Sequence, residues 1–464
     1  MVKFYMLLLK LILIGGWTMS TVDNAIVDGI GHDGQDESLY PVKERILDNW
    51  SYLFAWLGGC VSIGTFTLGS SMTHELNIVQ ALVAMFIGAT VVAVGLVFNG
   101  KFSHKYGVPY TIQLRSAFGI KGSKLPGFIR GVPAIIWFGF QSWVGASAIN
   151  MVSYSLFGYE NQVLFFILFQ LIQIALATTG FKGIKWLENI GSIFILLTLT
   201  YMFFSVINKY GAVISSEIVD FKGSWGLPFW GGVTAFTGVN CTVLLNVGDY
   251  VRNYKQGTKP AITGLIYWAA ILPITIFMGM IGLIVSTATG MANPIDVFSS
   301  AVDNQFLVIV TMIFIAAAQI TTNVLNNILP PSYVLMDTFK LSFKKSAIIV
   351  GLLSFATFPW KLISPESAAG LNLFVQAYSA FLGPIFAVLI VDYFFIKKEK
   401  INLADLYNEE GPFKGINWAA IIAIAVGAIV ALLEVRLSWY ASLPPTALTY
   451  YILMKKMPSA KTYW

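Results

Sequence analysis

The chain has 464 residues, of which 56% are hydrophobic and only 11% are charged. Soluble domains carry about 25% charged residues, so this chain has too little charge to cover a water-facing surface. Its net charge of +6 does not indicate a nucleic-acid partner, because the basic residues fall between long apolar blocks. The composition excludes an ordinary soluble domain and predicts a protein that lies in a lipid bilayer.

The first residues form a short apolar stretch, Met1–Gly16, that contains Lys3 and Lys10. Its composition resembles that of a signal peptide, but no small-residue cleavage site precedes the polar segment Ser20–Glu44. We therefore expect residues 1–18 to reflect a mistaken start codon, with Met19 as the true start. The alternative is a loose interfacial helix.

Long apolar blocks follow, and each is close to the roughly 20 residues that a helix needs to cross a bilayer. The blocks are continuous rather than alternating, which favours transmembrane helices over a β-barrel. The two cysteines lie inside such blocks and are expected to fill space rather than to form a disulfide or bind zinc. We predict about twelve spans: 50–72, 76–98, 130–157, 162–180, 189–207, 227–247, 260–286, 304–328, 347–363, 368–395, 416–435 and 440–454.

The loops between these spans carry a strong asymmetry of positive charge. If the N-terminus is cytoplasmic, 23 Lys and Arg residues fall inside and 4 outside. The positive-inside rule then places both termini in the cytoplasm of a multi-pass plasma-membrane protein. We divide the chain into a cytoplasmic segment 1–48, a ten-helix transport core 49–396, and two accessory helices with a cytoplasmic tail, 397–464. The loop Asn99–Ile129 is expected to hold one short surface helix.

Two spans are rich in glycine, which weakens a helix by roughly 1 kcal/mol per site relative to alanine. The first span contains Gly58, Gly59, Gly64 and Gly69, and the sixth contains Gly231, Gly232 and Gly238 after Pro228. Interrupted helices at matching places in two halves predict an inverted repeat of spans one to five and six to ten. The alternative is that these glycines only allow close helix packing.

Charged residues are missing from the middles of spans one, three, six and eight. An intramembrane ionisable residue marks a functional site by default, so this absence is informative. It disfavours a charged substrate and proton coupling through a membrane carboxyl, and it offers no catalytic acid, base or metal cluster. We therefore expect neither an enzyme nor a protein with a bound cofactor.

The third span instead contains Trp137 and Gln141, which are four residues apart and share one helix face. An indole beside a primary amide suits a flat ring, because the ring stacks while the amide pairs with its polar edge. The alternative for Trp137 is a packing or lipid-facing role. Trp143 lies on a different face and is expected to pack.

The eighth span has six polar side chains in the ten residues 318–327. Asn323 and Asn327 share a face, whereas Thr321 and Thr322 offer hydroxyl oxygens to a small hard cation. Carbonyl groups of an unwound first span, near Gly58 and Val61, would complete such a shell. The alternative is that these groups only hold helices together.

These residues resemble the nucleobase–cation symporters, and most closely the bacterial hydantoin transporters among them. The resemblance runs from about Trp50 to Lys456. It rests on four motifs: Trp137-Phe-Gly-Phe-Gln141, Thr321-Thr-Asn-Val-Leu-Asn-Asn327 with Pro331-Ser-Tyr, Leu382-Gly-Pro with Asp392-Tyr-Phe-Phe, and Arg115-Ser-Ala-Phe-Gly-Ile-Lys-Gly-Ser123.

The resemblance implies an all-α, leucine-transporter-type fold, with two five-helix inverted repeats and broken helices one and six. It implies that Trp137 stacks on the substrate and that Gln141 and Asn327 bond to its edge. It also implies a cation site, with the ligands Gly58, Val61, Ala318, Thr321 and Thr322. The expected activity is cation-coupled symport of a neutral ring (a purine, pyrimidine, allantoin or hydantoin), with sodium favoured and a proton as the alternative.

Two positions depart from the family pattern. The relative has a sixth-span tryptophan after a glycine, where this chain has Val239 and Asn240, and it has a first-span glutamine where this chain has Ser62. Losing an aromatic wall and gaining an amide should favour a ring with more polar edges. An amino-acid or vitamin transporter of the same fold, or a channel or sensor, remains the alternative. No obligatory protein partner is evident.

Overall fold

The computed structural model describes residues 36–60, 62–178, 200–201, 203–212, 214–301, 304–362 and 368–464. Within these ranges the chain is helical apart from its turns, loops and one isolated bridge, Leu47 to Tyr254. The predicted residues 1–18, Val61 and most of the fifth span lie outside the described ranges.

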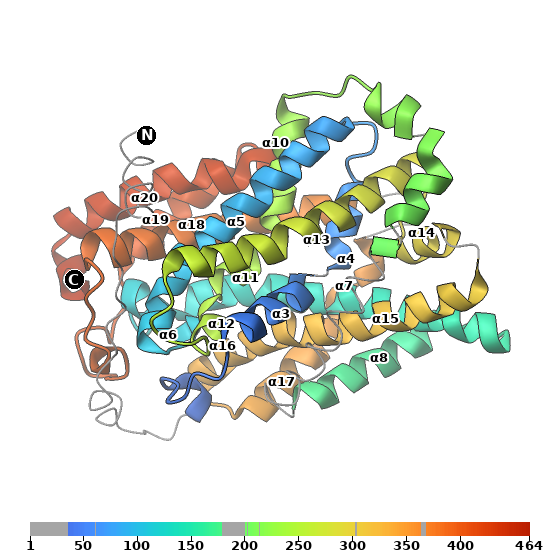
Figure 1. Ribbon diagram of the computed structural model, residues 1–464. Coiled ribbons are helices and arrows are strands. Elements are labelled where there is room, and N and C mark those ends of the chain that lie inside the picture. Colours follow the sequence, from blue (N-terminus) through green and yellow to red (C-terminus); the bar gives the residue numbers. More distant parts are fainter. Residues whose placement is uncertain are drawn as a thin grey trace.

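The helices run lengthwise through the molecule, and connecting loops gather at its two ends (Figure 1). In chain order they are α3 (Asn49–Cys60), α4 (Ile63–Ser70), α5 (Ile78–Tyr106), α6 (Tyr110–Phe118), α7 (Lys124–Phe157), α8 (Gln162–Ala177), α10 (Leu227–Gly238), α11 (Cys241–Leu245), α12 (Gly248–Val251), α13 (Pro260–Thr289), α14 (Pro294–Ala301), α15 (Gln305–Asn323), α16 (Leu329–Phe339), α17 (Phe343–Leu353), α18 (Ala369–Ile390), α19 (Trp418–Leu432) and α20 (Ser438–Lys456). Two π-helical segments, η3 (Val324–Ile328) and η6 (Val391–Ile396), continue α15 and α18.

Local sequence signals set the limits of the longest helices. Asn77 and Gln80 form a reciprocal capping box at the start of α5, which satisfies two backbone N–H groups that a helix start leaves unpaired. Gly107 ends α5 in the left-handed conformation, with φ at 75°, a geometry that glycine adopts without steric cost. Gly158 and Gly290 end α7 and α13 in the same way.

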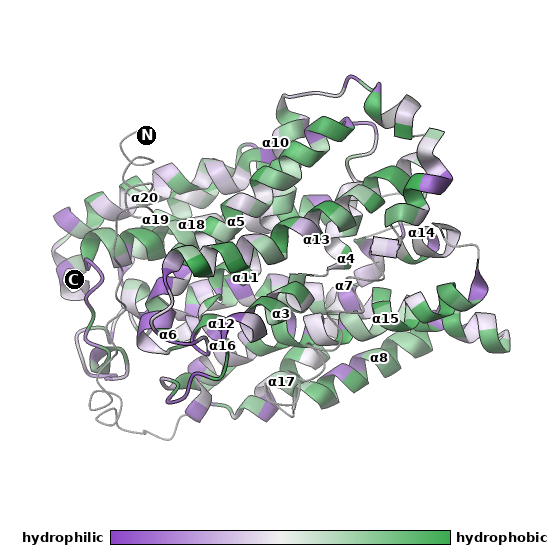
Figure 2. Cartoon of the chain, viewed as in Figure 1, coloured by the Kyte–Doolittle hydropathy of each residue, from purple (hydrophilic) through white to green (hydrophobic). Residues whose placement is uncertain are grey.

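Five helices in the described ranges are long and apolar enough to cross a membrane, and the bent pair α3 and α4 raises this to six. The helices α8 and α19 are apolar but shorter. Hydrophobic residues dominate the long helices, and hydrophilic residues gather where α6, α12 and α16 lie (Figure 2). The remaining predicted spans correspond to the broken α10 and α11, the short α17 and the α20 helix.

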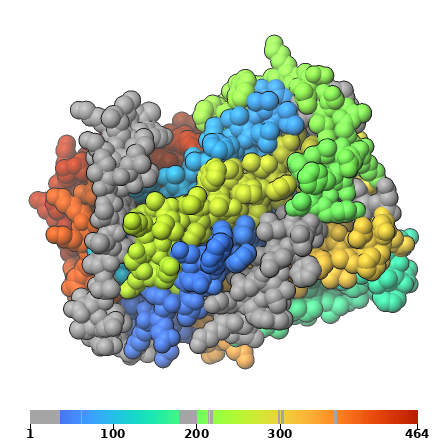
Figure 3. Space-filling view, in the orientation of Figure 1, coloured from blue at the N-terminus to red at the C-terminus, as the bar shows by residue number. Residues whose placement is uncertain are grey.

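Both predicted breaks are present. The axis of α3 and that of α4 differ by 46° across the break, and α10 gives way to α11 at Val239 and Asn240. The two halves also pack in the corresponding way, because α3 and α4 lie on α13 while α10 lies on α5. In the space-filling view, α5 and α13 form adjacent bands (Figure 3). The chain therefore has the leucine-transporter-type inverted repeat, and α7 packs on α15 within it.

The structure corrects three details of the predicted elements. The helix in the loop 99–129 exists as α6, but all of its residues are buried, so it is not a surface helix. The eighth span continues as one helical segment to Phe339, because Pro330 and Pro331 lie in the first turn of α16, where their missing N–H groups cost nothing. The ninth span is shorter than predicted, and α17 ends at Leu353 in 3-10 turns.

Candidate functional site

Trp137 lies in the middle of α7 and is only 3% exposed. Its indole Nε1 donates to the hydroxyl of Tyr378 on α18 at 3.2 Å. That hydroxyl in turn donates to the carbonyl of Gly238 at 2.8 Å, at the end of α10. The indole is therefore held between three helices, and its orientation is fixed by packing rather than by its own rotamer preference.

The benzo ring of Trp137 lies against the first turn of α4. A Cβ added at Gly64 would lie 2.5 Å from Cη2 and 2.6 Å from Cζ3 of the indole. Two further rings flank it: Phe140 at 5.5 Å in an edge-on arrangement and Phe374 at 6.0 Å with a tilt of 55°. This aromatic group gives a planar ligand a surface on which to stack.

A row of uncharged amides runs beside the indole. Gln141 Nε2 donates to the hydroxyl of Ser62 at 3.5 Å, at the break between α3 and α4. Asn327 Nδ2 donates to Gln141 Oε1 at 3.4 Å and to Asn323 Oδ1 at 2.8 Å. The structure thus joins Ser62, Gln141 and Asn327 by hydrogen bonds; their role with Trp137 in binding a substrate stays a prediction. The long distances to Gln141 indicate weak bonds, which a ligand can replace.

Asn323 fixes the position of Asn327. Its Nδ2 group lies within hydrogen-bond distance of the Phe138 carbonyl at 3.0 Å, the Ser142 hydroxyl at 3.1 Å and Gln173 Oε1 at 2.9 Å. Sequence reasoning placed Asn323 and Asn327 on one face, but it did not reveal these partners on α7 and α8. Asn323 is fully buried among them and acts as a positioning residue.

The π-helical segment η3 determines where two neighbouring asparagines point. Single-turn π segments occur mostly as local bulges inside α-helices, often at functional sites. Here Asn327 bonds to Gln141 and Asn323, whereas Asn326 Nδ2 donates to the Gly59 carbonyl of α3 at 3.3 Å. One segment therefore contacts both the amide row and the broken first span.

Four of the five predicted cation ligands lie in two close pairs. The Thr322 hydroxyl donates to the Gly58 carbonyl at 3.3 Å, which joins α15 to the end of α3. The Thr321 hydroxyl donates to the Ala318 carbonyl at 3.1 Å. These oxygens are of the kind that hard cations prefer, so the donor set fits sodium. Val61, the fifth, lies outside the described residues.

Asn240 and Val239 lie at the break between α10 and α11. The side chain of Asn240 makes no hydrogen bond to any other described residue, so both its donor and its acceptor are free for a ligand. It lines a cavity of about 40 Å³ with Trp56, Tyr250 and Asn326. Within the described residues, no hydrogen bond or ring contact joins Asn240 or Val239 to Trp137, Gln141 or Asn327.

Sequence reasoning missed Arg130, which it counted as a loop cation. Arg130 is fully buried, since α7 begins six residues before it. The guanidinium donates to the Thr242 carbonyl at 3.3 Å, Asn246 Oδ1 at 2.7 Å and the Asn326 carbonyl at 3.1 Å. It therefore ties α7 to the broken sixth span and to η3. No local pattern marked it, because its acceptors come from distant segments.

A further set of polar contacts joins Arg252 to the segment before α3 and to α16. Arg252 donates to the Ser38 carbonyl at 2.6 Å and to the Tyr333 hydroxyl at 2.9 Å. Nearby, burial and the positive charge of Arg252 lower the pKa of Arg45 to about 10.

Across the described residues, His, Cys, Asp and Glu form no group of three that would hold a metal ion. The site between Trp137 and Thr322 is therefore one of neutral amides, hydroxyls and carbonyls.

A family model matches residues 40–454, nearly the whole chain, and its description is a permease for cytosine/purines, uracil, thiamine and allantoin. The chain belongs to this family of permeases. Its members are transporters rather than enzymes, and the apolar helices agree with a multi-pass membrane protein.

Named relatives of this permease support the same assignment. The hydantoin permease of Microbacterium maritypicum is 28% identical over 90% of this chain and 88% of its own length. The allantoin permease of Bacillus subtilis is 28% identical over 92% of this chain and 94% of its own length. A transporter of the nucleobase-cation-symport-1 family, solved closed with bromovinylhydantoin bound, superposes with a TM-score of 0.83 at 25% identity over 93% of this chain and all of that one.

Proposed function

We propose that this permease carries a neutral, planar, nucleobase-like ring into the cell together with sodium, by alternating access. The observation that carries the proposal is the buried contact set of Trp137, Gln141, Asn327 and Ser62 beside the Thr322 to Gly58 pair. The same segment of α15 and η3 contributes to both groups, so a ring and a cation would bind within one assembly of helices.

The chemistry of the amide row supports a ring with alternating N–H and C=O groups. Each primary amide offers both a donor and an acceptor, and the row is uncharged. A charged ligand would lack a counter-ion there, whereas a lactam edge would find partners for both of its groups. Purines, pyrimidines, hydantoin and allantoin all have such edges. Asn240 offers a further amide in the neighbouring cavity that it lines with Asn326, and an added amide favours the members with more polar edges.

The cation assignment rests on the donor set. Gly58, Ala318, Thr321 and Thr322 supply carbonyl and hydroxyl oxygens from α3 and α15, and Val61 would add a fifth from the break. The Thr322 hydroxyl donates to the Gly58 carbonyl, which keeps both oxygens close. A small hard cation between them would replace that bond by two ion–oxygen contacts.

Unequal cavities at the two ends support alternating access. Two cavities of about 500 Å³ open at the end where α4 meets α5 and where α14 lies. Towards the opposite end, where α12 lies, the cavity that contains Asn240 has only about 40 Å³. We assign the wider end to the outside, in keeping with the positive charge of the opposite loops.

Uptake by purified protein in proteoliposomes tests the proposal. Labelled uracil, cytosine, hypoxanthine, allantoin and hydantoin are offered with an inward sodium gradient, with an equal potassium gradient, and with a proton gradient. We expect saturable accumulation of at least one ring with sodium only. Competition by amino acids tests the same-fold alternative. Absence of uptake for every ring, in protein that is folded and correctly inserted, would refute the proposal.

A further inference from the structure

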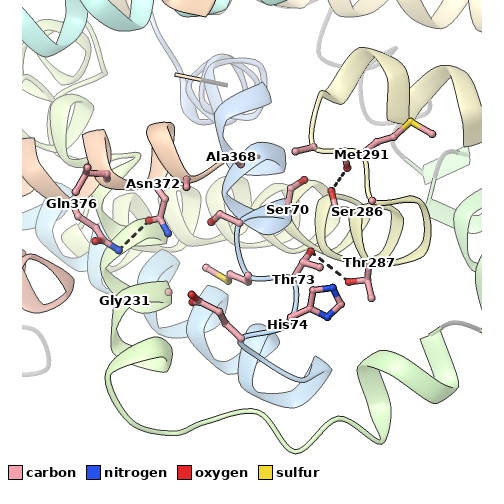
Figure 4. Close-up of a pocket in the computed structure, with 18 of the residues that line it drawn as sticks. Ser70, Thr73, His74, Gly231, Ser286, Thr287, Met291, Ala368, Asn372 and Gln376 are labelled. Atoms are coloured by element: carbon pink, nitrogen blue, oxygen red, sulfur yellow. Dashed lines mark hydrogen bonds between the residues drawn. The ribbon is translucent and has the colours of Figure 1, made fainter. Parts of the chain in front are cut away.

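A polar cavity of about 500 Å³ lies beside α18, lined among others by Ser70, Thr287, Asn372, Gln376 and Arg436 (Figure 4). We call it the α18 vestibule. The residues of the ring site described above do not line it. Its volume lies within the range of about 300–1,000 Å³ that small-molecule sites occupy.

Two amides of α18 face this vestibule. Asn372 and Gln376 are one turn apart and share a helix face, and Gln376 Nε2 donates to Asn372 Oδ1 at 3.0 Å. That bond leaves Gln376 Oε1 and the Asn372 amide N–H groups without a partner among the described side chains. Gln376 is only 6% exposed, and the cavity is where its side chain reaches open space. The vestibule therefore offers one free acceptor and one free donor on one helix face.

The opposite face of α18 belongs to the ring site. Phe374 lies 6.0 Å from the ring of Trp137, and the Tyr378 hydroxyl accepts from its indole nitrogen at 3.2 Å. Phe374 and Tyr378 are again one turn apart, with centroids 4.9 Å from each other. α18 thus carries the two vestibule amides on one face and two ring-site residues on the other.

Three ionisable side chains, His74, Glu75 and Arg436, line the vestibule, and the cationic one is already paired. Arg436 donates to both carboxylate oxygens of Glu434, from Nε and Nη2, each at 2.8 Å. The guanidinium is therefore not free to hold an anion, and the carboxyl group of Glu75 on the same wall disfavours one further. The polar groups that α18 itself contributes are the amides of Asn372 and Gln376. This polarity selects a neutral ligand with hydrogen-bonding edges.

We infer that the α18 vestibule is an entry subsite, in which a lactam edge donates its N–H to Gln376 Oε1 and accepts at its C=O from the Asn372 amide. The ligand class is the neutral ring of the proposed function, and the inference rests on that function. The subsite collects the ring before it reaches Trp137.

Equilibrium dialysis with labelled uracil tests the subsite in the full-length protein. Trp137→Ala removes the stacking surface of the ring site, and we expect it to keep a weak, millimolar binding of uracil. Adding Gln376→Met, which keeps the side-chain length but removes the amide, should weaken this residual binding about tenfold. The probe 1,3-dimethyluracil, which has no N–H, should not compete. Gln162→Met is the matched control, because Gln162 lines a different cavity and should change nothing.

A second variant tests the subsite independently, in case Gln376→Met does not fold. A methyl group at Gly231 would lie 3.5 Å from Gln376 Nε2 and 3.3 Å from Arg436 Cγ, so Gly231→Ala narrows the subsite and keeps both amides. In transport, both variants should raise the half-saturating concentration about tenfold and leave the maximal rate within twofold. Tight binding by wild type without residual binding in Trp137→Ala would overturn the subsite alone, and so would unchanged half-saturation in both variants. No binding of any ring by wild type would instead overturn the proposed function.

Discussion

The contact between Gly64 and Trp137 gives a quantitative test of the ring site. In Gly64→Ala the new methyl carbon would lie 2.5 Å from Cη2 of the indole, whereas non-bonded carbon atoms approach to about 3.5 Å at best. The indole must therefore move by about 1 Å, and its hydrogen bond to Tyr378 limits where it can go. Displacements of this size at a binding site cost up to about 100-fold.

We expect Gly64→Ala to weaken ring binding by about 10- to 100-fold, or about 1.4–2.8 kcal/mol, and to lower the melting temperature slightly through overpacking. The assay is a thermal-shift or dialysis titration of the transported ring on purified protein, since a ligand that binds only the folded state raises its stability. The matched control is Gly59→Ala in the same broken span, where a Cβ meets nothing within 4 Å.

A compensating variant separates steric displacement from a general loss of structure. Trp137→Phe shortens the ring, so Gly64→Ala should cost much less in that background, and the double-mutant cycle should show clear coupling. If Gly64→Ala binds the ring as wild type does, or if Gly59→Ala is equally damaging, the indole is not the stacking surface.

Three further outcomes follow from the same contacts. Trp137→Ala and Asn327→Ala should each abolish uptake in proteoliposomes while the protein still inserts, as judged by size-exclusion chromatography; uptake at half the wild-type rate would contradict their role. Thr322→Ala should raise the sodium concentration for half-maximal uptake at least tenfold while Thr322→Ser does not, and a wild-type sodium titration would show the cation site to be misplaced. Burial raises the pKa of Glu75 against the opposing effect of Arg436, so the ionised carboxylate destabilises the folded state as the pH rises. Glu75→Gln should therefore raise the melting temperature at pH 8 but not at pH 4. Equal shifts of the melting temperature at both pH values would refute this reasoning.

Features that depend on spacing within one segment could be predicted from the sequence. Trp137 and Gln141 share a face because helical periodicity places residues four apart on one side. The break after Cys60 follows the glycines that precede it, and Thr322 lies opposite Gly58 as the family resemblance implies. Each of these needs only local geometry or a motif.

Features that depend on packing between distant segments could not be predicted. The indole of Trp137 bonds to Tyr378, 241 residues further along the chain, and Arg130 meets acceptors 112 to 196 residues away. The polar residues on α18 give no signal in a hydropathy profile, because its apolar residues dominate the average. The π-helical turn at η3 was also hidden, since its sequence fits an ordinary α-helix.

The turn at η3 explains how one segment can serve a ring and a cation together. Thr322 contacts α3 at Gly58, Asn327 contacts α7 at Gln141, and Asn323 between them is fixed to α7 and α8. On the proposed function, an ion that drew α3 towards α15 would also bring the neighbouring Ser62 and the amide row into register, so part of the ordering would be complete before the ring arrives. Linkage then requires that the ring raise the affinity for the ion by the same factor. In the proposed mechanism, the neutral site would thus gain its coupling from shared helices rather than from a charge on the substrate.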